Sequence, residues 1–444
     1  MENCTDPFIL SAASVGRIWR RLRQSVFIVQ LSQLLSGEVF AQALGFAVMP
    51  LMTRLYGPAA FGILGVFFAV SEVLGRTSTL RYDLALVLPE KDVDAWPIFK
   101  FTVVFALVLC SALLLVSHPF RASLSGLLGS SELAVYFPLM ALMALGIGWQ
   151  SLASYWVMRE KHFKVIAYSS SGSAVIGNAF KVVAGLLAFS PSGLLLGTVL
   201  QRWSNLILIL ILTPSRIWKH KVEAGTPWLQ AKKYREFPLY RMPQDTINSF
   251  TRQLPAVIMA SFFSPAAAGI YLLAWRALTL PVSLLNNALR KVFYMRALDS
   301  VREGRSLFKL SLRVSGLIFV FMLPAALFIL FFGERLFVWV FGHEWAMSGQ
   351  YAKWIFAASV CTFGSLPAQV VIPIIGWNAF FLVYEIVSTF VRLGTVVFVA
   401  SCYDAYSTVV AISATSAASS LFLFVIVMYQ LYRKPADGFS VLAH

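Results

Sequence analysis

Long apolar runs follow one another along the whole chain, separated by short polar segments. Each run holds about 20 residues, the length that a helix needs to cross roughly 30 Å of hydrocarbon. A transmembrane β-barrel would instead alternate apolar and polar residues over segments of about ten. The pattern therefore predicts an all-α membrane protein with about twelve spans, at 26–50, 59–80, 98–117, 133–156, 165–189, 191–213, 244–263, 266–289, 310–332, 350–375, 379–401 and 406–431.

The composition supports a location in lipid. Of the 444 residues, 59% are hydrophobic and 13% are charged, which leaves more apolar surface than a soluble domain of this size can bury. We predict five consecutive parts: a basic N-terminal segment (1–25), a six-helix half (26–213), a basic linker (214–243), a second six-helix half (244–431) and a tail (432–444).

The formal net charge of +16 follows the predicted topology. Basic residues gather in alternate connections, at 17–23, 159–164, 216–241, 290–313 and 433–434. The connections on the opposite side hold little positive charge beyond Arg54, Arg121 and Arg335. By the positive-inside rule, both termini are expected to lie in the cytoplasm. The expected location is a bacterial inner membrane. Topology therefore explains the positive charge, and nucleic acid is not an expected partner.

A short motif occurs twice, at 56–63 (YGPAAFGI) and 263–270 (FSPAAAGI). Both copies fall at the turn between the first two spans of a six-span half, and the offset of about 207 residues also aligns Glu38 with Asp245. Because six is an even number, duplicated halves would share one orientation and would be related by an axis along the membrane normal. Parallel halves of this kind enclose a central cavity in many secondary transporters.

Three sequence blocks add a family resemblance over nearly the whole chain. The first begins at 50–58 (PLMTRLYGP) and continues to 81–89 (RYDLALVLP), the second is 265–271 (PAAAGIY) and the third is 342–345 (GHEW). In this order they resemble the polysaccharide-export branch of the multidrug/oligosaccharidyl-lipid/polysaccharide exporter superfamily, which includes the Wzx-type flippases.

This resemblance implies two six-helix bundles that work by alternating access. The implied activity moves an undecaprenyl-diphosphate-linked oligosaccharide, such as an O-antigen, capsule or exopolysaccharide repeat unit, from the cytoplasmic to the periplasmic leaflet. A polysaccharide polymerase and other assembly proteins are the implied partners. The family supplies no catalytic motif and no cofactor.

Charged residues deep in the predicted spans are the candidates for function, because each costs about 2.5–3.5 kcal/mol to place in a membrane. The deep cations are Lys181, Arg202, Arg252, Arg276 and Arg392. The acids available to neutralise them are fewer, which predicts a cationic cavity between the halves. Because the guanidinium fork matches phosphate oxygens, we predict that these five cations bind the substrate, with Arg252 and Arg276 leading.

The acidic residues separate into two groups. Glu72 and Arg76 have the i,i+4 spacing that favours an ion pair on one helix, so we predict a structural pair. Glu38, Asp245 and Glu385 are candidates for coupling transport to an ion gradient, since an acid near a cationic cavity can change its charge as access changes. A fixed salt bridge to a cavity arginine is the alternative for each of them.

Nothing in the sequence indicates an enzyme. The five histidines and four cysteines lack the spacing of a metal site, and no phosphate-binding Gly-x-x-x-x-Gly-Lys loop is present. Three other classes stay open. A multidrug or cation antiporter of the same superfamily would favour acids around its cavity, a polysaccharide polymerase or ligase would need a larger periplasmic surface, and a structural assembly partner would need neither.

Overall fold

The computed structural model describes residues 26–89, 91–120, 126, 131–214 and 231–433. Within these ranges every long element is a helix, so the predicted all-α membrane fold is confirmed. The predicted segment 1–25, most of the predicted linker (215–230) and most of the tail (434–444) lie outside the described residues.

The described residues form twelve helices of 19 residues or more. The first half contains α2 (Val26–Leu55), α3 (Pro58–Ser78), α5 (Asp92–Ser117), α7 (Phe137–Arg159), α8 (Phe163–Leu186) and α9 (Ser192–Leu212). The second contains α11 (Met242–Phe262), α12 (Pro265–Arg302), α13 (Leu307–Phe341), α14 (Ala346–Gly364), α16 (Asn378–Cys402) and α17 (Ala405–Arg433). Short helices join them: α4 (Tyr82–Ala85), η1 (Ser131–Tyr136), η3 (Phe237–Arg241), η4 (His343–Trp345) and α15 (Leu366–Val371).

By length and hydropathy alone, nine helical segments of the described chain qualify as membrane spans. The helices α2, α8 and α11 are not among them, so these criteria do not establish the predicted number of twelve. Polar stretches explain why α8 and α11 fall short, at 169–173 (SSSGS) and 244–248 (QDTIN). Ser170 and Ser173 of α8 line an interior cavity.

Equivalent helices pack in the same way in the two halves. In the first half α3 packs on α7 and α7 on α9, while in the second α12 packs on α14 and α14 on α17. The pairs α8–α9 and α16–α17 also correspond. This shared arrangement is what the sequence repeat predicts. One helix differs, because α11 packs mainly along α3 of the first half.

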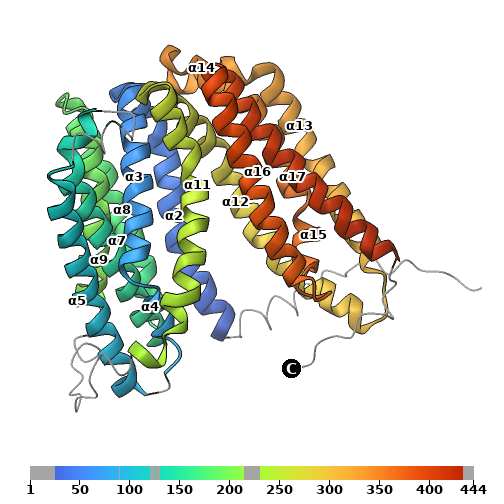
Figure 1. The fold of residues 1–444 in the computed structure, drawn as a ribbon, viewed down its shortest axis with the longest axis horizontal. Coiled ribbons are helices and arrows are strands. Elements are labelled where there is room, and N and C mark those ends of the chain that lie inside the picture. The colour runs from blue at the N-terminus through green and yellow to red at the C-terminus, as the bar shows by residue number, and fades with distance from the viewer. Residues whose placement is uncertain (1–25, 90, 121–125, 127–130, 215–230, 434–444) are drawn as a thin grey trace, which may run out of the picture.

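The two halves converge at one end of the molecule and diverge at the other, as Figure 1 shows. We call the converging end, where the turns at 55–58, 262–265 and 341–346 lie, the closed end. The diverging end, which carries α4, is the open end.

The repeated motif holds the closed end together. Pro58 and Pro265 begin α3 and α12, and these two helices cross at their first turns. A methyl group on Gly62 would overlap the carbonyl oxygen of Pro265, and one on Gly269 would overlap that of Pro58. Each glycine therefore leaves room for the backbone of the other copy, so the two copies of the motif pack against each other.

A tryptophan completes this contact between the halves. The indole Nε1 of Trp345, a fully buried side chain of η4, donates to the carbonyl oxygen of Thr53 on α2 at 3.1 Å. Its ring also meets the edge of Phe61 on α3, with ring centroids 5.1 Å apart. The closed end is thus sealed by apolar packing and one buried hydrogen bond.

Near the open end, α11 is attached to the first half by polar contacts. The Nε of Arg81, just after α3, donates to a carboxylate oxygen of Asp245 at 2.7 Å. One turn away, the hydroxyl oxygens of Thr77 and Thr246 lie 3.2 Å apart. These contacts explain why α11 stays with α3 while the rest of the second half diverges.

Candidate functional site

Three cations from three helices face one cavity. Lys181 of α8, Arg202 of α9 and Arg276 of α12 line a space of about 550 Å³, together with Glu38 and Gln42 of α2. We call this space the cationic cavity. It continues into a second space of about 480 Å³, which Lys181 and Arg276 also line and which reaches residues of the second half such as Gln253 and Trp275. The site therefore lies between the halves.

Neutral groups, not carboxylates, hold the cations. The Nζ of Lys181 donates to the side-chain oxygen of Gln201 at 2.9 Å, and the Nη1 of Arg202 donates to that of Gln150 at 2.9 Å. The guanidinium of Arg276 lies over the ring of Phe68, 5.7 Å from its centroid. Among the described residues, no carboxylate forms an ion pair with any of the three.

These partners orient the cations without cancelling their charge. Lysine has three N–H donors and arginine has five, so each side chain keeps donors for a ligand. Three cations and one acid, Glu38, line the cavity, which leaves a net positive charge. Because all three cations are only half-buried, they stay accessible from the cavity.

Glycines on α8 and α9 make room for one of these hydrogen bonds. A methyl group on Gly197 would strike the stem of Lys181, and one on Gly177 would strike the stem of Gln201. Each glycine thus gives space to a side chain of the opposite helix, and the two side chains meet in the Lys181–Gln201 bond. Close packing of α8 and α9 therefore fixes the position of the lysine.

The five predicted binding cations do not all come together. Arg252 of α11 has an exposed side chain, its Nη2 lies 3.4 Å from the hydroxyl of Ser249, and it does not line the cationic cavity. Its neighbour Gln253 lines the second space that continues this cavity, because consecutive helix positions differ by about 100° in direction. The structure therefore places Lys181 and Arg202, and not Arg252, beside Arg276 in the lining. Substrate binding by the five predicted cations stays a prediction.

Arg392 belongs to a different cavity. Together with Glu385, seven residues earlier on α16, it lines a pocket within the second half. This pocket also contains residues of α12, α14 and α17.

The predicted acids are also separated. Glu38 lines the cationic cavity, whereas Asp245, its counterpart in the repeat, is in the ion pair with Arg81. The Glu72–Arg76 pair is present on α3, with 2.6 Å between the charged atoms. Both residues line a small space of about 160 Å³ that shares Arg202 and Gln150 with the cationic cavity.

Reasoning from charge missed the uncharged residues of the site. Gln150, Gln201 and Gln42 cost less to bury than a charge, so a search for deep charges passes over them. Phe68 has no distinguishing pattern among the 37 phenylalanines of the chain. Arg81 falls in the block at 81–89, which points to the residue but not to its partner.

Comparison with known protein families identifies the family of this chain. Residues 51–350 match the model of a family described as "Polysaccharide biosynthesis protein". The chain belongs to this family. The match covers more than half of the sequence and confirms the resemblance inferred from its motifs.

A curated relative is the "Succinoglycan biosynthesis transport protein ExoT" of Rhizobium meliloti (strain 1021). It is 24% identical to this family member over 312 residues, which are 68% of this chain and 60% of the relative. The aligned part thus spans about three fifths of the relative's length.

Two solved structures share the fold. One is an inward-facing multidrug resistance MATE family transporter of the MOP superfamily, with a TM-score of 0.61, 14% identity and coverage of 91% of this chain and 98% of that one. The other is the lipid II flippase MurJ in an inward closed conformation, with a TM-score of 0.60, 12% identity and 90% coverage of both chains. At these identities the likeness establishes the fold of this multi-pass membrane protein, and it does not choose between the two activities.

Proposed function

We propose that this protein is a flippase that carries a lipid-linked oligosaccharide from the cytoplasmic to the periplasmic leaflet. The observation that carries the proposal is the convergence of Lys181, Arg202 and Arg276 on one cavity, where no carboxylate of the described residues pairs with them. In this proposal the diphosphate of the carrier lipid binds these three cations. The curated relative from Rhizobium meliloti is named a transport protein, and this name supports a transport activity for the present chain.

Electrostatics explains why such a cavity suits this cargo. A diphosphate carries about two negative charges, and an unpaired charge is strongly disfavoured in hydrocarbon. A cation about 4 Å from each charge contributes roughly 4 kcal/mol at an effective dielectric of 20. The apolar lipid chain has the opposite preference, with about 0.8 kcal/mol per methylene for staying in the bilayer. The head group therefore crosses inside the protein while its tail remains in lipid.

The positions of the cations suggest a path for the head group. Arg202 and Arg276 lie about three turns into α9 and α12, both of which begin at the closed end, whereas Lys181 lies five residues before the end of α8 at the closed end. A head group entering from the open end meets the two arginines and then the lysine. Release on the other side requires the packed glycines Gly62 and Gly269 to separate and the two halves to approach at the open end.

A multidrug antiporter is the competing function, because one of its kind has the same fold. A lipophilic cation would bind poorly in a cavity lined by three cations and one acid. The charge of the cavity therefore favours an anionic cargo.

The orientation of the proposed flippase follows from its basic residues. Those at 159–164, 232–241 and 290–313 gather toward the open end, whereas Arg54 and Arg335 lie toward the closed end. By the positive-inside rule the open end faces the cytoplasm and both termini lie there. The described conformation is then the one that accepts cargo from the cytoplasmic leaflet.

Cysteine labelling tests this orientation. In a variant without Cys4, Cys110, Cys361 and Cys402, Lys232→Cys is expected to react with an impermeant thiol reagent only after the inner membrane is opened. His343→Cys, an exposed position of η4 at the closed end, is expected to react in intact spheroplasts. Equal labelling of the two positions would contradict the orientation.

Deletion of the gene tests the function itself. The deletion strain is expected to lose its surface polysaccharide and to accumulate the lipid-linked oligosaccharide, because synthesis on the inner leaflet continues without export. The wild-type gene should reverse both changes, and a Lys181→Gln/Arg202→Gln double variant present at equal level should reverse neither. Normal surface polysaccharide in the deletion strain, with no second exporter encoded, would contradict the proposal.

A further inference from the structure

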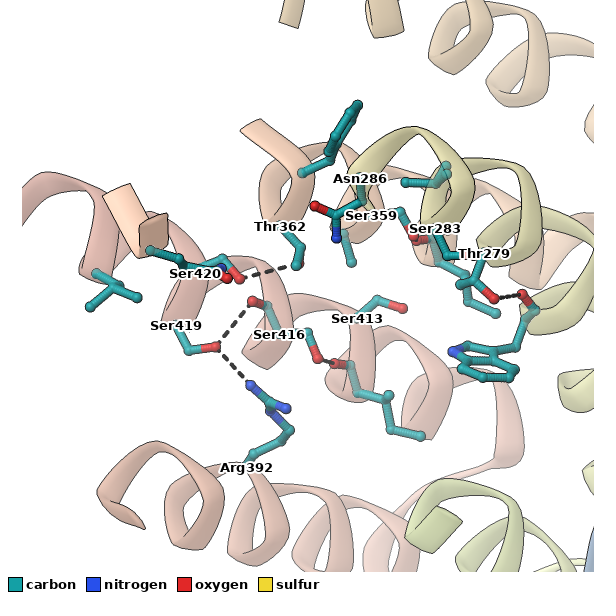
Figure 2. A pocket seen from close by; sticks show the side chains of 18 of the residues that line it. Thr279, Ser283, Asn286, Ser359, Thr362, Arg392, Ser413, Ser416, Ser419 and Ser420 are labelled. Carbon is teal, nitrogen blue, oxygen red and sulfur yellow. Dashed lines mark hydrogen bonds between the residues drawn. The ribbon is translucent and has the colours of Figure 1, made fainter. Parts of the chain in front are cut away.

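The second half contains a polar pocket that the cationic cavity does not include. It has a volume of about 410 Å³ and lies between α12, α14, α16 and α17. Figure 2 shows Arg392 and Asn286 extending toward it from opposite sides, with hydroxyl side chains from three helices around it. We call this space the hydroxyl pocket. Serine, threonine, asparagine, glutamine, glutamate and arginine side chains make up more than half of its lining residues.

The hydroxyl groups of this pocket face it mainly as acceptors. Ser416 of α17 and Ser359 of α14 each donate to a backbone carbonyl oxygen one turn earlier, at 2.8 Å. Thr279 of α12 does the same at 2.6 Å. Their protons are therefore used, while the oxygen lone pairs stay free. A matching ligand is one that brings several O–H donors.

Two buried polar atoms in the pocket lack a partner. Arg392 donates from Nη2 to the hydroxyl of Ser419 at 3.0 Å, but its Nε makes no hydrogen bond within the described structure. The Oδ1 of Asn286 is buried and unpaired in the same way. A buried polar atom left unpaired costs about 1–3 kcal/mol, so a ligand that bonds both atoms gains from each. The pocket thus offers one further donor and one further acceptor.

Aromatic side chains give the pocket flat walls. Tyr384 is fixed by its hydroxyl, which donates to the carbonyl oxygen of Ser419 at 2.5 Å. Trp275 lines both the hydroxyl pocket and the space that continues the cationic cavity. It is also the sequence neighbour of Arg276. An aromatic face covers the apolar C–H face of a sugar ring well, and Trp275 connects the two sites.

We infer that the hydroxyl pocket binds a sugar unit of the oligosaccharide, distal to the diphosphate held in the cationic cavity. The inference rests on the proposed function. A sugar unit both donates and accepts through its hydroxyls and presents an apolar face, which matches the serines, the two unpaired atoms and the aromatic walls. The lipid tail does not match, because it would leave every one of these polar groups unpaired. The pocket then selects cargo by its glycan, while the cations bind what all cargoes share.

Binding measurements with two different lipids distinguish the role of the hydroxyl pocket from that of the cationic cavity. The probes are undecaprenyl diphosphate bearing one hexose and undecaprenyl diphosphate bearing the complete repeat unit, both extracted from the strain that makes the polysaccharide. Binding to purified protein is measured by native mass spectrometry. Ser416→Leu fills the pocket, and we expect it to weaken binding of the complete lipid about tenfold, the effect of roughly 1.4 kcal/mol. Binding of the one-hexose lipid should stay within about twofold, since this lipid has no distal sugar.

Controls make the outcome decisive. Ala418→Leu adds the same bulk to an exposed face of α17 and should change neither lipid. Arg392→Gln should repeat the selective loss, and it replaces Ser416→Leu if that variant does not accumulate. Equal effects of Arg392→Gln on both lipids, or no effect on either, would overturn the inference. Arg276→Gln should weaken the binding of both lipids. If the wild-type protein binds neither lipid, the proposed function itself fails.

Discussion

Arg276→Glu is expected to abolish export while the protein still accumulates in the membrane. The residue lies between the two halves, with its guanidinium over Phe68 and without an acidic partner among the described residues. Reversing its charge replaces attraction for the diphosphate by repulsion of similar size, several kcal/mol at an effective dielectric near 20. No ion pair of the described structure is lost, so folding should be largely spared.

Export by variants at position 276 should decrease in order as the side chain loses first the shape and then the charge of arginine. Arg276→Lys keeps the charge but loses the fork, so export should be partial. Arg276→Gln removes charge-assisted hydrogen bonds worth roughly 1.5–3 kcal/mol each, which corresponds to roughly a 10- to 150-fold loss of affinity. Surface polysaccharide in a strain lacking the chromosomal gene is the measurement, with protein level determined in parallel.

The matched control is Arg296→Glu, which makes the same change at an exposed position on α12 outside the cavity. This variant should export most of the polysaccharide that the wild-type protein exports. Full activity of Arg276→Glu at normal protein level would show that this arginine does not meet the substrate. Equal loss from both glutamate variants would instead indicate a general effect on α12.

Alanine at Gly62 or Gly269 is expected to reduce export by about fivefold or more. A methyl group at either position overlaps a carbonyl oxygen of the other motif copy, so α3 and α12 must move apart. Overpacking of this kind costs roughly 1–3 kcal/mol, which is a factor of about 5 to 150 in an equilibrium. The cost falls on the described conformation, in which the closed end is packed. The variants should therefore shift the protein toward a state that is open at this end.

Labelling of His343→Cys together with a cysteine at Gln253, inside the cavity, measures that shift. In the Gly62→Ala background the cavity cysteine should become reactive to an impermeant reagent applied from the periplasm. Gly316→Ala is the control, because a methyl group there meets no atom of the described residues within 4 Å. Unchanged export and unchanged labelling in both glycine variants would mean that the crossing of α3 and α12 is not part of the gate.

The sequence alone predicted the architecture because hydrophobic length and charge bias are properties of single segments. The repeat at 56–63 and 263–270 even identified the two turns that meet at the closed end. The repeat did not reveal that its two copies pack against each other, because similarity between two segments does not show that they are in contact. The number of spans was harder to fix from composition where α8 and α11 carry polar residues toward the interior.

The site was predictable only in part. Depth in a span selects a charged residue, but the direction of its side chain depends on the rotation of the helix and on its neighbours. Lys181, Arg202 and Arg276 share a cavity because α8, α9 and α12 turn these faces toward one another. Arg252 and Gln253 are consecutive on α11 and point about 100° apart, and Gln253 is the one that lines the space beside Arg276. The repeat aligned Glu38 with Asp245, yet α11 packs on α3 and gives Asp245 to Arg81 instead.

Reconstitution measures the proposed activity most directly. Purified protein is placed in liposomes whose outer leaflet has received undecaprenyl diphosphate linked to a radiolabelled oligosaccharide, and a glycosidase outside the liposomes then reports the fraction still exposed. Wild-type protein should move the label to a protected inner leaflet much faster than liposomes without protein, and Arg276→Glu protein should match the protein-free rate. Equal rates for wild type and Arg276→Glu would contradict the claim that the cationic cavity carries the diphosphate across the membrane.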